Sequence, residues 1–216
     1  MNESSGPADL GLRSRGPSPA KTAQTRRNIT AAALDAFLER GFSGTRMSDV
    51  AARAGIAKGT LYLYFADKEA LFEGVLREVI AEPLSGLGSA APRPGESVRA
   101  FLSRVAGPIL RDMERSRRAA VIRLVVSEGA RFPVLAETYR RVVIDPAAAA
   151  IRQLARRAME TGELRTDALV RFPQLLAAPG VLVTLWNGLF AAEDGPLDGE
   201  AVFEAYLDMV FGADAG

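Results

Sequence analysis

Cysteine and histidine are both absent from the 216 residues of this chain. Their absence excludes disulfides, thiolate nucleophiles, zinc sites built from Cys and His, and any catalytic triad that needs histidine. The sequence has no run of about 18 apolar residues that would predict a transmembrane helix, and its N-terminus lacks the apolar stretch of a signal peptide. We therefore expect a cytoplasmic protein without a metal, a cofactor or a membrane partner.

Charge is nearly balanced over the whole chain but not along it. The formal net charge is +1, yet residues 11–66 hold nine Lys and Arg against three Asp and Glu. One basic segment beside a near-neutral remainder favours a local contact with a polyanion such as nucleic acid. A solvated helix face with a basic tail explains the same numbers, so the charge alone leaves both interpretations open.

Apolar residues recur at helical spacing throughout, and no sustained alternation typical of β-strands occurs. We predict an all-α chain of about nine helices. Residues 1–20 are rich in Ser, Gly and Pro and are expected to be disordered. A second stretch dense in Pro and Gly, residues 82–95, separates a small head (21–81) from a larger helical-bundle body (96–212). Within the body, Pro146 predicts a kink, and Pro179-Gly180 predicts a break.

Residues 47–64 have the pattern of two short helices joined by a tight turn. Ala51 stands where two helices would cross closely, Gly55 stands at the turn, and Leu61 stands on the buried face of the second helix. A small residue, a turn glycine and a buried aliphatic residue at these offsets are typical of a helix-turn-helix. An ordinary pair of antiparallel helices in a bundle remains the alternative.

The residues themselves resemble a known family. The string FSGTRMSDVAARAGIAKGTLYLYFADKEAL, residues 42–71, is similar to the DNA-binding head of TetR-type transcriptional repressors over almost its whole length. Its most specific part is GIAKGTLYLYFADKEALF, residues 55–72. The resemblance weakens after about residue 80, although RLVVSEGARFPVLAETY, residues 123–139, is similar to the core of the family's effector domains.

This resemblance implies a set of DNA-contacting residues. They lie at the start of the first short helix, along the second, and at the head of the following helix: Thr45, Arg46, Ser48, Lys58, Gly59, Thr60, Tyr62, Leu63, Tyr64 and Lys68. Lys68, beside the expected helix cap Asp67, would bind phosphate. Two positions depart from the family pattern: Ala57 weakens a helix cap, and Leu63 favours a thymine-methyl contact over hydrogen bonds.

The body carries more apolar residues than one core-facing stripe can bury. The segment from Leu169 to Phe190 is apolar on more than one face, which predicts either a dimer interface or a fully buried central helix. The family resemblance implies a homodimer through residues 169–190 and the last helix, 199–211, packed as a four-helix bundle.

The resemblance also implies a small-molecule effector bound in the body. The candidate pocket residues are mostly apolar: Phe101, Val105, Ile109, Met113, Arg123, Leu124, Glu128, Phe132, Tyr139 and Trp186. For each apolar member, ordinary core packing is the competing explanation. Arg123 and Glu128 would anchor a ligand, pair with each other, or face solvent.

These features together predict a dimeric repressor that binds a palindromic, double-stranded DNA operator and is released by a small, largely apolar ligand. The alternative is an effector-independent DNA-binding or architectural protein with the same head. An α-helical enzyme is the third class, but the sequence offers no catalytic histidine, cysteine or paired-carboxylate motif for it.

Overall fold

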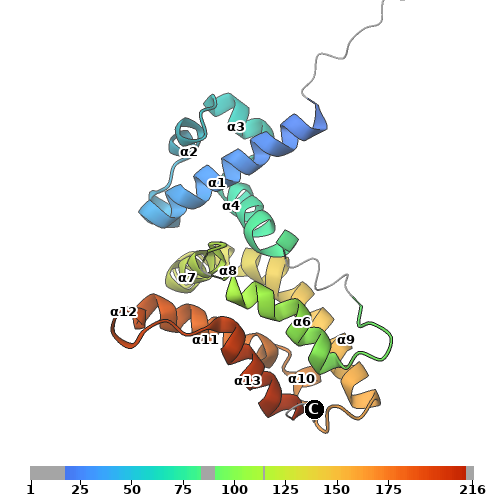
Figure 1. Cartoon of the computed structure of the whole chain (residues 1–216). Coiled ribbons are helices and arrows are strands. Elements are labelled where there is room, and N and C mark those ends of the chain that lie inside the picture. The colour runs from blue at the N-terminus through green and yellow to red at the C-terminus, as the bar shows by residue number, and fades with distance from the viewer. Residues whose placement is uncertain (1–17, 84–90, 114, 213–216) are drawn as a thin grey trace, which may run out of the picture.

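The computed structural model describes residues 18–83, 91–113 and 115–212, and no strand occurs among them. The all-helical prediction is confirmed. The head, at the top of Figure 1, contains four α-helices, the last of which continues as a short π-helix. These elements are α1 (Pro19–Gly44), α2 (Met47–Arg53), α3 (Lys58–Tyr64), α4 (Lys68–Leu76) and η1 (Arg77–Ala81).

The body lies below the head in Figure 1 and is a bundle of helices of very different lengths. Its elements are α6 (Val98–Arg111), α7 (Arg118–Glu128), α8 (Pro133–Tyr139), η2 (Arg140–Ile144), α9 (Asp145–Glu160), α10 (Ala168–Arg171), α11 (Gln174–Leu189), α12 (Ala191–Asp194) and α13 (Gly199–Phe211). In the described part of the chain, no helix is both long and apolar enough to cross a membrane.

Helix α1 begins at Pro19, before the start of its apolar pattern, and its regular winding ends at Gly41. Ser18 caps its first turn, and Pro19 occupies a position whose N–H would have no helical partner. At Gly41 the backbone leaves the helical region with a φ of +71°. The ring of Phe42 then stacks on that of Phe37, with centroids 5.6 Å apart. Most of the tail predicted to be disordered, residues 1–17, lies outside the described residues.

The two body prolines stand in different settings. Pro146 stands in the first turn of α9, and the π-helix η2 precedes it, so the chain passes from α8 to α9 through a locally widened turn. The predicted break at Pro179-Gly180 is wrong. Helix α11 runs through both residues, and the interruption falls at Phe172 and Pro173 instead. Packing of α11 against α7 and α13 outweighs the one backbone hydrogen bond that Pro179 removes.

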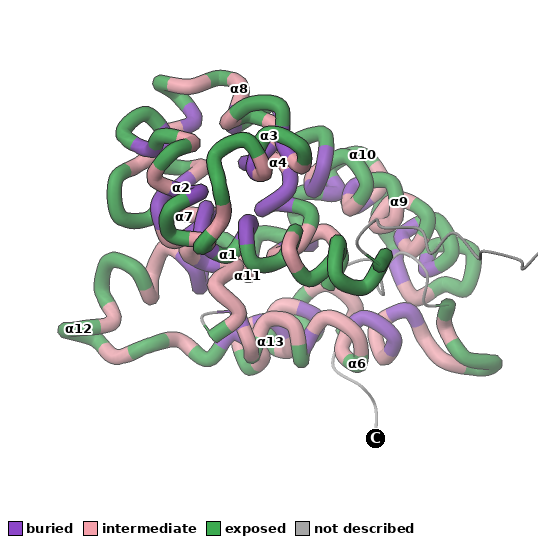
Figure 2. The backbone as a smooth tube through the Cα atoms, turned by 90° about the horizontal axis from the view of Figure 1, so that it is seen from above, coloured by how far each residue is buried: buried purple, intermediate pink, exposed green. Residues whose placement is uncertain are grey.

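Two clusters of buried apolar residues hold the molecule together. One joins α6, α9, α11 and α13 around residues such as Phe101 and Phe203. The other contains Phe37 and Phe72 of the head, and it continues without interruption to Val121 and Leu135 of the body. Figure 2 shows buried segments in both parts of the molecule. The head therefore shares its core with α7, α8 and η2 rather than folding around a core of its own.

Ion pairs reinforce this boundary between head and body. Arg141 of η2 pairs with Glu73 of α4 at 2.7 Å, and Arg117, at the start of α7, pairs with Asp35 of α1 at 2.6 Å. Glu73 also accepts hydrogen bonds from Arg77, one turn along the same segment. The two guanidinium groups lower the pKa of the Glu73 carboxyl to about 2.

We expect Glu73→Gln to reduce the sensitivity of the fold to acid. Because folding lowers the pKa of Glu73 from 4.5 to about 2, its stabilising contribution is complete above pH 4.5 and is lost as the pH falls through this range. The free energy of unfolding, measured by urea titration between pH 5 and pH 2, should therefore fall less steeply in the variant. Glu69→Gln, an exposed change on the same helix, is the control. Identical pH slopes in the wild type and Glu73→Gln would contradict the prediction.

Candidate nucleic-acid interface and body cavity

The segment that predicts a helix-turn-helix folds as one. Ala51 of α2 and Leu61 of α3 are buried, with 2% and 0% of their surface exposed. Gly55 turns the chain between them with a φ of +68°, a conformation that residues with a side chain rarely adopt. The backbone N–H of Ile56 donates to the carbonyl of Ala51 at 3.0 Å and closes the turn. The spacing argument therefore gives the correct geometry at all three positions.

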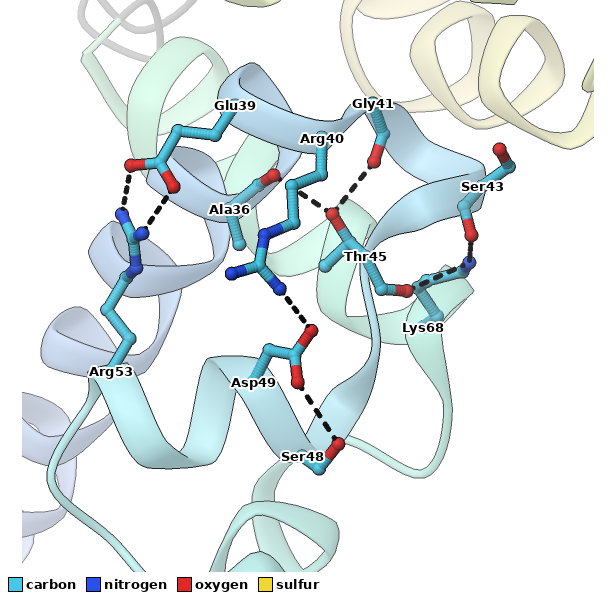
Figure 3. Close-up of polar contacts among 10 residues, drawn as sticks. All are labelled: Ala36, Glu39, Arg40, Gly41, Ser43, Thr45, Ser48, Asp49, Arg53 and Lys68. Carbon is cyan, nitrogen blue, oxygen red and sulfur yellow. Dashed lines mark hydrogen bonds and ion pairs between the residues drawn. The ribbon is translucent and has the colours of Figure 1, made fainter.

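Ion pairs fix α2 against the end of α1 (Figure 3). Arg40 binds Asp49 at 2.5 Å, and Arg53 makes two hydrogen bonds to the Glu39 carboxylate, one of 2.6 Å and one shorter. These pairs neutralise two arginines of the basic segment. Among the residues that the structure describes, the nearby Arg46 makes no ion pair with a carboxylate and is exposed. Its charge is therefore available to an external anion.

The outer face of α3 presents an aromatic and an aliphatic side chain to solvent. Leu63 is 84% exposed and Tyr62 is 44% exposed, while Leu61 between α3 and the core is fully buried. Lys58 stands above the Tyr62 ring, with its ammonium 5.9 Å from the centroid. An added Cβ at Gly59 would meet no atom within 4 Å, so the backbone there is open to a close approach. Thr60 and Tyr64 are half-buried at the edge of this face.

Thr45 corrects the predicted set of DNA-contacting side chains. Its side chain is buried, and its hydroxyl lies 2.8 Å from the Gly41 carbonyl oxygen and 3.0 Å from that of Ala36 (Figure 3). Carbonyl groups at the end of a helix lack a helical partner, and the single hydroxyl hydrogen can be donated to either of these two. Thr45 therefore holds the exit of α1 in place, and its side chain does not reach the outer face. Ser48, three residues on, is exposed and lies 3.4 Å from Asp49.

Lys68 has partners that the sequence did not predict. Asp67 caps α4 as expected, accepting from the Ala70 N–H at 2.7 Å. The Lys68 ammonium, however, donates to the carbonyls of Phe42 at 2.7 Å, Thr45 at 3.2 Å and Ser43 at 3.4 Å. It also lies 4.5 Å from the centroid of the Phe42 ring. Lys68 thus ties α4 to the exit of α1, and a contact with phosphate stays a prediction.

A half-open cavity of about 210 Å³ lies in the body, and two of its lining residues, Ala177 and Val181, are exposed. It is formed by α6, α7, α9, α11 and α13, and its lining contains no charged or hydrogen-bonding side chain. The lining residues are Leu102, Ala106, Ile109, Leu110, Met113, Ile122, Ala147, Ala150, Ile151, Leu154, Leu176, Ala177, Gly180, Val181 and Phe203. Such a cavity favours a neutral, apolar occupant, because an ion would lose its hydration without gaining a partner.

Only Ile109 and Met113 of the ten predicted pocket residues line this cavity. On α6 the lining stripe passes through Leu102 and Ala106, so the predicted stripe through Phe101 and Val105 is displaced by one residue and packs into the body core. The other predicted members lie elsewhere. Leu124, Phe132 and Tyr139 join the core shared with the head, Trp186 packs on Phe190, and Arg123 and Glu128 line a separate hollow beside α1. The sequence did not indicate that small residues such as Ala147 and Ala150 line a cavity, because alanine is common in helices whatever it faces.

An exposed apolar face extends over α11 and α13. Leu182 and Met209 are 52% and 83% exposed, and they lie in one groove with Ala178, Pro179, Val202, Ala205 and Tyr206. Val183, the next residue of α11, is buried with 3% exposed. Helix α11 therefore has one apolar face inside the body and a second, adjacent apolar face outside it.

The fold and the exposed helix-turn-helix define a DNA-binding regulator with a separate helical body. Two family models match the chain: bacterial regulatory proteins of the tetR family over residues 29–75, and the tetracyclin repressor-like C-terminal domain over residues 92–195. The chain belongs to the TetR family of transcriptional regulators, which are DNA-binding regulators and not enzymes.

Individual relatives are similar mainly in the head. The HTH-type transcriptional regulator RutR of Escherichia coli is 46% identical over 70 residues, which is 32% of this chain. The chain thus spans about a third (31%) of that relative's length. A TetR-family structure from Rhodococcus sp. has a TM-score of 0.71 at 21% identity, covering 88% of this chain and 99% of its own. A SmeT–triclosan complex has a TM-score of 0.69 at 23% identity, covering 89% and 93%. These structures establish the fold.

Substitutions on the buried and on the exposed side of α3 should have different effects. The first should lower the free energy of unfolding, and the second should weaken binding to DNA. Leu61→Ala removes a fully buried side chain, and we expect it to cost roughly 2–5 kcal/mol of folding free energy. Tyr62→Ala should change the free energy of unfolding by less than about 1 kcal/mol but abolish binding to a duplex selected by the wild-type protein from random sequence. Urea titration and fluorescence anisotropy measure the two effects. Equal destabilisation by both variants would contradict the assigned orientation of α3.

Proposed function

We propose that this regulator is a homodimeric repressor that binds a palindromic operator through α3 and is released by a small, neutral ligand held in the body cavity. The observation that carries the first part is the exposure of Tyr62 and Leu63 beside Lys58 and Gly59. Aromatic and aliphatic side chains on the open face of a recognition helix suit thymine methyl groups and sugar edges, and a flanking lysine suits phosphate.

The apolar face of α11 and α13 supports a dimer. A head of this kind reads a short half-site, so two heads held in register by two-fold symmetry are needed to read a palindrome. The groove from Ala178 to Met209 is contiguous and apolar, and Leu182 and Met209 within it are more than half exposed. A second copy of the same helix pair would bury both grooves in one isologous interface.

The cavity supports a ligand-responsive regulator over an effector-independent one. A void lined only by apolar side chains gains contacts when an apolar molecule fills it, whereas an architectural protein has no use for it. The cavity touches α7, which also packs against α1 of the head. Displacement of α7 by a ligand would therefore reach the DNA-binding helices directly. Triclosan, the ligand named for SmeT, is a suitable first probe.

Charged substitutions at neighbouring positions of α11 test the dimer. Leu182→Glu places a charge on the exposed groove and should give a folded monomer, because an unpaired carboxylate buried in the interface costs several kcal/mol. Val183→Glu places the same charge in the core and should unfold the body. Sedimentation velocity reports association and circular dichroism reports folding. A wild-type monomer, or two variants that both remain folded dimers, would rule out this interface.

Filling the cavity tests the ligand site. Triclosan at 100 times its Kd should stabilise the wild type by about 2.7 kcal/mol, and it should weaken binding to the selected duplex. Ala150→Phe occupies the cavity and should abolish both responses, whereas Ala149→Phe, on the exposed side of α9, should keep them. Naphthalene should act like triclosan, and decanoate should not. An Ala150→Phe protein that responds like the wild type would place the ligand elsewhere, and a wild type whose DNA binding ignores every probe would support the effector-independent alternative.

A further inference from the structure

A single carboxylate from the body reaches into the exit of α1. Glu128, the last residue of α7, accepts a hydrogen bond from the backbone N–H of Phe42 at 2.9 Å, across 86 residues of sequence. Its carboxylate also fills the space beside Gly41, where an added Cβ would lie 2.4 Å from Oε1. The glycine is required there twice, for its φ of +71° and for the room that Glu128 occupies.

Phe42 is held at both its backbone N–H and its backbone carbonyl. The Phe42 carbonyl accepts from Lys68 of α4 at 2.7 Å, so the residue is fixed by a body carboxylate at its N–H and by a head ammonium at its carbonyl. Its ring packs against Phe72 of α4 at 5.9 Å and Phe132 of the body at 5.7 Å. Phe42 is therefore the point at which α1, α4 and the body meet, five residues before the helix-turn-helix begins at Met47.

We propose that Glu128 is a positioning residue that fixes the angle of the head relative to the body, and that it thereby sets the affinity for two half-sites bound together. Apolar packing between head and body resists separation but is non-directional. The hydrogen bond from the Phe42 N–H to the Glu128 carboxylate is directional, and hydrogen bonds to carboxylates are roughly twice as strong as bonds between neutral groups. The second part of the proposal rests on the dimeric operator-binding function proposed above.

A fixed angle matters because the second half-site is bound intramolecularly. When one head is bound, the effective concentration of the other depends on how narrowly its position is distributed. Loosening the joint spreads that distribution without altering any contact between a head and its own half-site. The effect of Glu128 should consequently appear at a palindrome and not at an isolated half-site.

The first experiment measures the joint without DNA. Because the chain has no cysteine, spin labels can be attached to Ala52→Cys in the head and Ala149→Cys in the body, both exposed, with labelled protein diluted in unlabelled protein. The distance distribution within one chain should be narrow in the wild type and broadened by Glu128→Ala. Glu128→Gln, whose amide oxygen still accepts from Phe42, should restore the narrow distribution, and Glu137→Ala, an exposed change on α8, should leave it narrow. Equal widths in the wild type and Glu128→Ala would overturn the proposal.

The second experiment uses the duplex selected by the wild type and a copy with one half scrambled. Glu128→Ala should lower the affinity for the intact duplex about tenfold, within the usual range of coupling between sites. Its affinity for the half-scrambled duplex should equal that of the wild type. Loss of affinity for both duplexes would mean a destabilised head and would overturn the proposal. A wild type that binds both duplexes equally well would instead refute the dimeric function, while the distance measurement would still judge the role of Glu128.

Discussion

Helices of seven residues do not persist in water by themselves, because forming the first turn costs more entropy than so few hydrogen bonds return. Both helices of the DNA-binding motif, α2 and α3, have this length. They exist because Val50, Ala51 and Leu61 are buried against α1 and α4. The ion pairs of Arg40 and Arg53 then set the angle of α2. The whole interface for DNA is therefore a product of tertiary packing, and its geometry depends on whatever holds α1 and α4.

What holds α1 and α4 belongs partly to the body. The buried cluster around Phe37 and Phe72 continues into α7 and α8, and the pairs Glu73–Arg141 and Asp35–Arg117 cross the same boundary. Because of these contacts, the head and the body cannot rotate freely relative to each other. A shift of α7 would therefore change the support of the DNA-binding helices.

Local sequence signals predicted the parts of the molecule that depend on local physics. The helix-turn-helix, the Asp67 cap and the turn at Gly55 follow from spacing and residue type. The differences between prediction and structure fall where distant segments meet. Thr45 looks like a DNA ligand in the sequence, but its side chain is buried against carbonyls of the α1 exit. Lys68 binds carbonyls of the same segment, and its contact with phosphate stays a prediction. The body cavity is lined by Ala106 rather than Val105, a one-residue change of helical phase that the apolar pattern of α6 does not resolve. Helix α11 continues through Pro179 because its neighbours hold it there.

The cavity also has a cost when nothing occupies it. Side chains such as Ile109, Ile151 and Phe203 line it with walls that offer no hydrogen bonds to water, and they have fewer dispersion partners than in a close-packed core. We therefore expect the body with an empty cavity to be more easily compressed than a close-packed bundle. Hydrostatic pressure, which favours states that eliminate internal voids, should then destabilise it, and a molecule that fills the cavity should oppose that effect.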